Sequence, residues 1–303
     1  MKFAMIGLGK MGANMVRRLI NNGHEAQVYD VDYAIAQKLE SELEQVHAVK
    51  SIEEFFTQQQ TPRVIWMMVP HECVDDTLAS LLDAGLRAGD VVIDGGNSNY
   101  RLSQKRANQL AEKDILFVDS GTSGGVWGLE NGYSIMVGGS TQAIEIITPL
   151  LQSLAPEANS GWGHVGPSGA GHYSKMVHNG IEYGMMQAFA EGFELMEAKK
   201  EFNLDLEQIS AIWQQGSVVR SWLLDLIHDA LGDDNLLESL SDYVDDSGEG
   251  RWTIQDSIEN AVPTPVLSLA LQMRFRSRQE SSYAGKILNA MRAGFGGHSI
   301  KPS

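Results

Sequence analysis

A glycine pattern at the start of this 303-residue chain constrains its fold more than any other feature. A short apolar run from Lys2 leads directly into Gly-Leu-Gly-Lys-Met-Gly, and a helical stretch follows as far as Asn22. In such a strand–turn–helix setting the first glycine permits a tight turn, the second lets a pyrophosphate approach the backbone, and the third lets the helix pack closely on the strand. The pattern predicts a dinucleotide-binding βαβ unit whose cofactor contacts come from Gly7, Leu8, Gly9, Lys10, Met11 and Gly12.

A carboxylate near the end of the next expected strand indicates which dinucleotide binds. Residues 26–31 read as a strand, and Asp30 lies 18 positions after Gly12. A carboxylate there can accept hydrogen bonds from the adenosine ribose hydroxyls but repels a 2′-phosphate, and no arginine follows among residues 31–33. We therefore expect NAD rather than NADP; the alternative is that Asp30 only ends the strand. Val69, which ends a later strand, is expected to contact the same cofactor.

The two halves of the chain have different patterns. Strand-like runs at 63–69, 91–94, 116–119 and 134–137 alternate with helical stretches, which predicts parallel βαβ units in a doubly wound sheet. From about Gly166 the strand signal ends. Residues 172–201 read as one long helix, and helix-like segments follow at 206–215, 218–231, 252–260 and 265–293. We therefore expect an α/β chain, with a Rossmann-type dinucleotide-binding domain at 1–165 followed by an all-helical domain at 166–303 for substrate binding and oligomerisation.

Composition excludes several classes of function. The net charge of −16 and the pI of about 4.8 argue against a nucleic-acid partner, because phosphate backbones require a basic surface. The chain has no run of eighteen apolar residues, so no membrane span is expected. Cys73, the single cysteine, fits a reducing compartment, and a cytosolic location is expected. No cluster of histidine, cysteine and acidic residues has metal-ligand spacing, so no metal is expected.

The long helix carries a lysine and a carboxylate at a helical spacing. Residues seven apart return to nearly the same face two turns later, so Lys175 and Glu182 share a face with His178 and Asn179, and Tyr183 lies at its margin. The base and the acid are then about 10 Å apart along the helix axis. A lysine and a carboxylate so placed can act as base and acid on one bound substrate. Taken alone, the pattern equally fits a solvated stripe with ordinary ion pairing.

Several short segments together carry a family resemblance. The glycine pattern at 7–12, the loop Asp-Ser-Gly-Thr-Ser-Gly-Gly at 119–125, and the lysine and asparagine of the long helix are shared across the β-hydroxyacid dehydrogenase superfamily. Four further segments are more selective: Asp-Gly-Gly-Asn-Ser at 94–98, the helical segment 175–184, Gly-Arg-Trp-Thr at 250–253, and the tail at 292–298. With them the chain resembles the decarboxylating 6-phosphogluconate dehydrogenases, in particular their short bacterial NAD-linked form.

The resemblance implies a reaction and roles for the helix residues. Lys175 would act as the base that takes the proton of the 3-hydroxyl while NAD accepts a hydride, and Glu182 would protonate C1 after loss of CO2, giving ribulose 5-phosphate. Substrate contacts are implied for the carboxylate loop and for residues that hold sugar hydroxyls or orient the nicotinamide: Ser123, Gly124, Gly125, Asn97, His178 and Asn179. Asn97 is therefore expected to contact both the cofactor and the substrate.

The 6-phosphate of such a substrate requires cations. The resemblance assigns Arg274 to the phosphate, with Tyr183 as an additional donor, while for Arg276 and Arg278 a solvent-facing position is the simpler interpretation. The longer enzymes carry a lysine where this chain has Ser247, and Arg251 replaces a second family lysine. Arg251 is the candidate for the missing charge.

The tail is expected to act in a second subunit. Arg292 and His298 resemble tail residues that, in the family, complete the neighbouring active site, which implies a homodimer or homotetramer.

Two other functions fit parts of the pattern. Another β-hydroxyacid dehydrogenase or reductase, acting on a short hydroxy acid, would keep Lys175 and Asn179 but would not need Glu182 or the phosphate residues. A non-catalytic NAD-binding protein would need only the glycine pattern.

Overall fold

The computed structural model describes residues 1–58, 61–233 and 236–296. By its contacts the chain divides into two compact units, Met1–Asn179 and Gly180–Ser303, called here the first and the second unit.

The first unit is built on one eight-stranded sheet with the order β3-β2-β1-β4-β5-β6-β7-β8. The strands are β1 (Lys2–Ile6), β2 (Glu25–Tyr29), β3 (Val46–Ala48), β4 (Val64–Met67), β5 (Val91–Asp94), β6 (Leu116–Ser123), β7 (Ser134–Gly139) and β8 (Trp162–Gly166). Every neighbouring pair is parallel except β6 and β7. The strand order reverses between β1 and β4, and ligands of such sheets bind in the crevice at this switch point.

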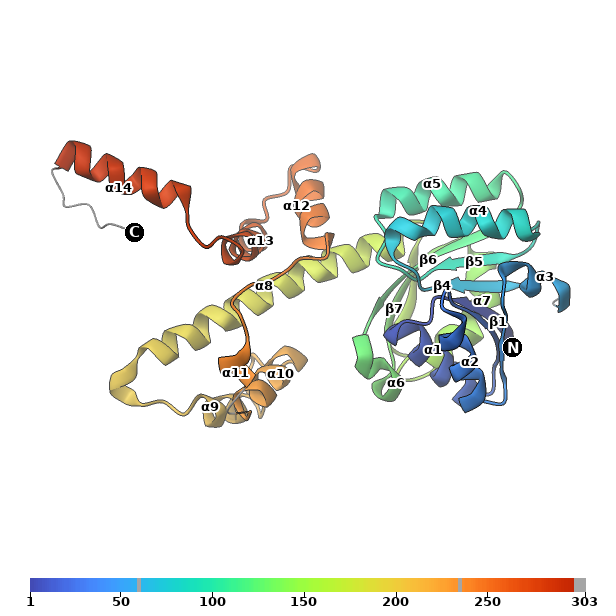
Figure 1. Cartoon of the computed structure of the whole chain (residues 1–303), viewed down its shortest axis with the longest axis horizontal. Coiled ribbons are helices and arrows are strands. Elements are labelled where there is room, and N and C mark those ends of the chain that lie inside the picture. The colour runs from blue at the N-terminus through green and yellow to red at the C-terminus, as the bar shows by residue number, and fades with distance from the viewer. Residues whose placement is uncertain (59–60, 234–235, 297–303) are drawn as a thin grey trace. The chain divides into compact units, whose positions relative to one another are not determined.

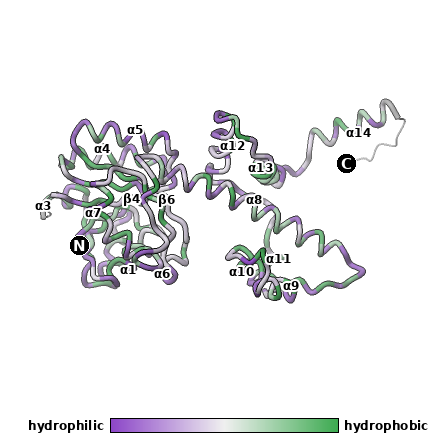
Figure 2. Tube along the Cα trace, turned by 180° about the vertical axis from the view of Figure 1, so that it is seen from behind, coloured by the Kyte–Doolittle hydropathy of each residue, from purple (hydrophilic) through white to green (hydrophobic). Residues whose placement is uncertain are grey.

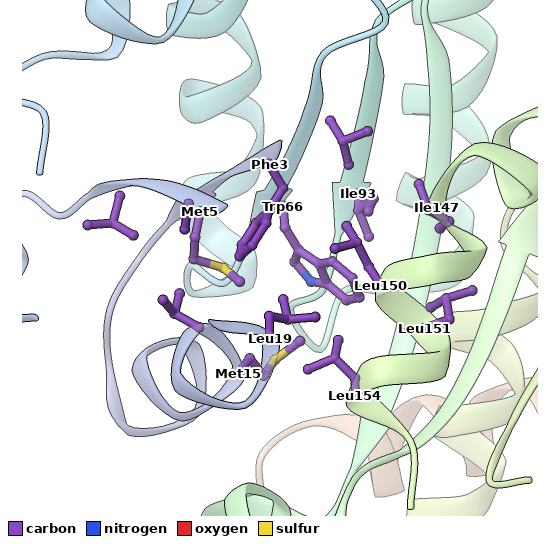
Figure 3. Packing of buried hydrophobic residues seen from close by; sticks show 14 of the residues in the cluster. Phe3, Met5, Met15, Leu19, Trp66, Ile93, Ile147, Leu150, Leu151 and Leu154 are labelled. Carbon is purple, nitrogen blue, oxygen red and sulfur yellow. The ribbon is translucent and has the colours of Figure 1, made fainter. Parts of the chain in front are cut away.

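Helices cover both faces of this sheet (Figure 1). They are α1 (Lys10–Asn21), α2 (Tyr33–Glu42), α3 (Phe55–Gln58), α4 (Val74–Ala84), α5 (Tyr100–Ala111), α6 (Gly128–Asn131) and α7 (Thr141–Leu154). One core, which contains Leu19, Trp66 and Leu150, lies under α1, α2 and α7 (Figure 3). The other core contains Ile65 and Leu78 and lies under α3, α4 and α5. Neighbouring residues of β4 enter different cores because side chains alternate along a strand.

The long helix α8 (Ala170–Ala198) begins in the first unit and continues into the second. The second unit also contains α9 (Leu206–Trp213), α10 (Trp222–Leu231), α11 (Leu236–Ser239), α12 (Glu249–Glu259), α13 (Pro265–Ser277) and α14 (Tyr283–Gly296). Its small core joins Tyr183 of α8 to Ala270 and Leu271 of α13. Hydrophobic and hydrophilic stretches alternate along α8 (Figure 2). Short 3-10 helices lie at Ile52–Glu54, His71–Cys73, Gly125–Trp127 and Lys200–Phe202.

The fold-class prediction is confirmed, with corrections at three elements. The sequence pattern did not indicate β3 or β8, because β3 has three residues and β8 contains two glycines. The helix expected at 265–293 is two helices, α13 and α14. The break lies in a polar stretch, where the Ser282 side chain accepts a hydrogen bond from the Gly285 backbone N–H and so caps the start of α14.

The strands end at Gly166, close to the domain boundary expected at residue 165, yet the first compact unit continues to Asn179. The reason is that the first turns of α8 pack directly on the sheet. Glycines permit this contact, because a Cβ on Gly171 would lie 2.6 Å from the carbonyl oxygen of Met136 in β7. None of the described helices has the length and apolar character needed to cross a membrane.

Candidate functional site

The glycine pattern forms a cradle at the carboxyl end of β1. Gly7 has a φ of +90°, and a Cβ there would lie 2.5 Å from the carbonyl oxygen of Met68. A Cβ on Gly12 would collide with the carbonyl oxygen of Gly7, so α1 can approach β1 only without a side chain. At Gly9, by contrast, a Cβ would meet nothing within 4 Å. The open side at Gly9, next to the start of α1, fits the approach of a pyrophosphate.

A cavity of about 760 Å³ opens beside this cradle. It brings together most of the residues predicted for the cofactor: Gly7, Gly9, Lys10, Met11, Gly12, Asp30, Val69 and Asn97. Leu8 is buried and contributes its backbone N–H, which donates to Asp30 Oδ2 at 2.7 Å. The other carboxylate oxygen of Asp30 accepts from the N–H of Asp32 at 3.0 Å. Each oxygen keeps a second lone pair, so the fixed carboxylate can still accept from a ribose hydroxyl.

Strand β6 anchors the start of α8. The Asp119 carboxylate is completely buried and accepts from the backbone N–H groups of Gly169, at 2.6 Å, and His172, at 2.9 Å. The two N–H groups lie just before and within the first turn of the helix, where such groups have no partner within the helix and a negative charge is favourable. The sequence pattern did not indicate this tertiary cap, because the two partners are about fifty residues apart.

This anchor places Lys175 against the sheet. A Cβ on Gly121 would lie 2.5 Å from the Cβ of Lys175, so the lysine fits only over a glycine. Lys175 is 7% exposed, and its Nζ donates to Asn179 Oδ1 at 2.7 Å. His178 Nδ1 lies 3.3 Å from the same oxygen. Lys175, His178 and Asn179 therefore form one hydrogen-bonded group on the helix face that the spacing predicted them to share.

The predicted carboxylate loop follows β6 in the first unit. Ser123 ends the strand, and Gly124 and Gly125 have φ values of +128° and +52°, which favour glycine. A Cβ on Gly124 would lie 3.2 Å from the ring of Tyr133, whereas at Gly125 it would meet nothing within 4 Å. The backbone at Gly125 is therefore accessible from one side.

Glu182 and Tyr183 lie on the part of α8 that belongs to the second unit. Glu182 is half-buried and follows Lys175 by seven positions on the same continuous helix. Tyr183 is buried, and the Arg274 guanidinium lies over its ring, 3.5 Å from the centroid. The Tyr183 hydroxyl accepts from the backbone N–H of Ser247 at 3.3 Å. Tyr183, Ser247 and Arg274 thus form one group.

Arg251 and Arg278 form a second group of cations around Asp246, which was not among the expected residues. Arg251 donates to both oxygens of Asp246, at 2.8 and 3.0 Å, and its guanidinium lies over the ring of Phe275. Arg278 also donates to Asp246, at 2.8 Å, and is only 20% exposed, so its expected solvent-facing position is wrong. Hydrogen bonds from Arg251 and Arg278 lower the pKa of Asp246 to about 2.

The remaining predicted residues lie in the tail. Arg292 is exposed on α14, and His298 lies outside the described residues. Across the part of the chain that the structure describes, no group of three or more histidine, cysteine or acidic side chains is arranged to hold a metal ion.

Comparison with known proteins covers almost the whole chain. Residues 2–163 match the family model of the NAD binding domain of 6-phosphogluconate dehydrogenase, and residues 171–295 match that of the 6-phosphogluconate dehydrogenase C-terminal domain. The NAD(+)-dependent, decarboxylating 6-phosphogluconate dehydrogenase of Haloferax volcanii is 40% identical over 303 residues, which are 99% of this chain and 98% of that protein.

Longer relatives match over about two thirds of their length. The NADP(+)-dependent, decarboxylating enzyme of Bacillus subtilis is 33% identical over 301 residues, 95% of this chain and 64% of that protein. A solved structure of Plasmodium falciparum 6-phosphogluconate dehydrogenase has a TM-score of 0.85 and 27% identity, covering 100% of this chain and 66% of that one. The first unit thus contains an NAD-binding domain, and the chain belongs to the 6-phosphogluconate dehydrogenase family.

Proposed function

We propose that this protein oxidises and decarboxylates 6-phosphogluconate to ribulose 5-phosphate and CO2, with NAD as the electron acceptor. The observation that carries the proposal is the buried amine of Lys175, held by Asn179 on a helix that has a carboxylate two turns later. Burial disfavours a charged amine, which suits a lysine that must accept a proton.

NAD, when bound, accepts a hydride from the substrate carbon that bears the 3-hydroxyl. In this proposal, Lys175 takes the proton of that hydroxyl and then returns it to the new carbonyl oxygen. The carbonyl receives the electron pair of the breaking carbon–carbon bond, so CO2 leaves and an enediol forms. Glu182 protonates the terminal enediol carbon while Lys175 takes the hydroxyl proton again. The cycle ends with Lys175 protonated and Glu182 ionised, and a proton passes back before the next turnover.

The remaining predicted residues are assigned to the substrate from its carboxylate to its phosphate. We assign its carboxylate to Ser123, Gly124 and Gly125, where the backbone is accessible at Gly125. Asn97, His178 and Asn179 are assigned to the hydroxyls or the nicotinamide. The phosphate is assigned to Arg274 and Tyr183, which are already stacked, and Arg292 and His298 of a neighbouring subunit complete this end. Arg251 is the weaker candidate for the phosphate, because Asp246 occupies its donor fork.

We also propose a preference for NAD over NADP. Asp30 is fixed at the end of β2 inside the cofactor cavity, where its charge repels a 2′-phosphate. Among the described residues that line this cavity, Lys10 is the only basic side chain.

We also propose that the protein is a homodimer or homotetramer in the cytosol. The second unit exposes large apolar side chains that a second subunit can cover, including Leu195, Val218 and Ile258, which are 74%, 100% and 75% exposed. The single cysteine supports a reducing compartment.

A direct assay tests the reaction. Purified protein is mixed with 6-phosphogluconate and either NAD or NADP, and reduced nicotinamide and CO2 are followed together. We expect equal amounts of NADH and CO2, and a higher kcat/KM with NAD. NADH without CO2, or turnover of a short 3-hydroxy acid but not of the phosphosugar, would instead support the simple dehydrogenase.

A further inference from the structure

Arg106 of α5 is a buried charge whose role the proposed reaction does not explain. Its side chain is 3% exposed. Nη1 lies 3.2 Å from both Asp94 Oδ2 and Ser98 Oγ, and Nε donates to Asp75 Oδ1 at 2.6 Å. A guanidinium withdrawn from water to this degree is tolerated because it is paired, and its removal leaves the partner carboxylate uncompensated. The two partner groups belong to different elements.

One group is the loop that follows β5. Asp94 is completely buried; its Oδ1 accepts from the N–H of Gly96 at 3.1 Å and its Oδ2 from the hydroxyl of Ser98 at 2.7 Å. The Asp94 side chain therefore closes residues 94–98 into a tight loop around itself. Gly95, Gly96 and Asn97, the three residues between these contacts, line the cofactor cavity.

The loop has little freedom to relax. A Cβ on Gly96 would lie 2.8 Å from the carbonyl oxygen of Val69, so this loop packs closely against the segment that follows β4. A displacement of Asp94 by even part of an ångström would consequently be passed to Asn97.

The other group is the first turn of α4, which lies beside α5 on the same face of the sheet (Figure 1). Asp75 belongs to this turn, and Asp76, Thr77 and Ser80 of the same helix line the same cavity. The hydrogen bond from Arg106 holds the pKa of the Asp75 carboxyl below its usual value. Asp75 is ionised at neutral pH, so the link is charged at both ends.

We propose that Arg106 is a positioning residue for the cofactor: it ties the loop 94–98 to the first turn of α4, which form two walls of the NAD cavity. Separate N–H groups of one planar guanidinium reach the two walls. A lysine presents its donors from a single atom and cannot make the same pair of contacts. The inference concerns NAD binding, so it does not require the reaction proposed above.

The test is the Kd for NADH of the full-length protein, measured by the fluorescence of the bound nucleotide. We expect Arg106→Gln to raise this Kd by about tenfold or more, because charge-assisted hydrogen bonds at a buried group are lost. On a logarithmic scale of Kd, Arg106→Lys should recover less than half of the NADH affinity that Arg106→Gln loses. Lys105→Gln, which removes one positive charge from an exposed neighbour on α5, should leave the Kd within about twofold.

Thermal unfolding separates this role from a purely structural one. If Arg106 only stabilises the fold, Arg106→Gln lowers the unfolding temperature but leaves the Kd of the folded protein within about twofold, and the proposal is wrong. Full rescue by Arg106→Lys would also overturn it, because charge alone would then suffice.

A second set of variants applies if Arg106→Gln does not fold. Asp75→Ala removes the acceptor on α4, where the carboxylate is 67% exposed, and Ser98→Ala cuts a contact to the loop. If Arg106 couples the two walls, the double variant changes the NADH affinity by a factor that differs at least twofold from the product of the single changes. Strictly multiplicative effects would contradict the coupling.

Discussion

Lys175 is a lysine in a position that water scarcely reaches. Most lysines extend their amine into solvent, whereas this residue is 7% exposed and its amine donates to Asn179. Two contacts with β6 explain this burial. Gly121 leaves room for the lysine stem, and the Asp119 cap fixes the turn of α8 that precedes Lys175.

The role of this amine can be tested by removing its nitrogen. Lys175→Met keeps the length of the side chain, and we expect kcat to fall by about 10²–10⁴-fold because the proton acceptor is lost. The Kd for NADH should stay within about twofold. Lys113→Met, at an exposed position on the same unit, is the matched control and should retain normal turnover. A Lys175→Met protein that turns over within a few-fold of the wild type would remove Lys175 from the mechanism.

Among the elements, α12 and α13 are joined by one carboxylate. Asp246 precedes α12, binds Arg251 in its first turn, and binds Arg278 at the end of α13. Its side chain is 3% exposed although both arginines are partly solvated. Because Asp246 pairs with both Arg251 and Arg278, the two positive charges lie close to Phe275 with less repulsion between them.

The low pKa of Asp246 predicts an acid-sensitive contact. Its pKa is about 2 in the folded chain and near 3.8 ordinarily, so its contribution to stability is full above about pH 5 and is lost as the pH falls from about 4 to 2. Asp246→Asn should therefore lower the unfolding temperature by about 2–4 °C at pH 7, with a difference that shrinks toward pH 3. Asp242→Asn, at an exposed position, is the control. A difference that is constant with pH would show that the charge of Asp246 is not the cause.

The sequence predicted elements well where a pattern is local. Strand–helix alternation gave the doubly wound sheet, and helical spacing gave the Lys175–Asn179 contact, because both follow from periods of two and 3.6 residues. Contacts between distant segments leave no such period. The Asp119 cap, the partners of Arg106 and the pairing of Arg278 with Asp246 therefore became visible only with the fold. The break after α13 was missed because the polar stretch between the two helices contains no proline or glycine to mark a helix end.

At the scale of the whole molecule, the exposed surface of α14 bears on how the chain associates with a second copy. Arg292 is exposed on α14, and the same helix exposes Tyr283, Leu288 and Met291, which are 77%, 58% and 50% exposed. An isolated helix of this length gains little stability from its own hydrogen bonds, so an apolar face of this kind requires a partner surface. A second subunit is the partner that the family resemblance implies.

Two variants that lack different parts of the proposed site can test whether the tail serves a neighbouring subunit. Deletion of residues 292–303 should leave the Kd for NADH within about twofold and weaken phosphosugar binding by at least about tenfold, because phosphate cations are lost. Lys175→Met keeps the tail but lacks the base. In a mixed dimer, one site combines the intact lysine of the truncated chain with the intact tail of its partner. At a low phosphosugar concentration, mixing the two proteins under conditions of subunit exchange should therefore raise turnover above the sum of the two separate proteins. A tail that serves its own chain predicts no such increase.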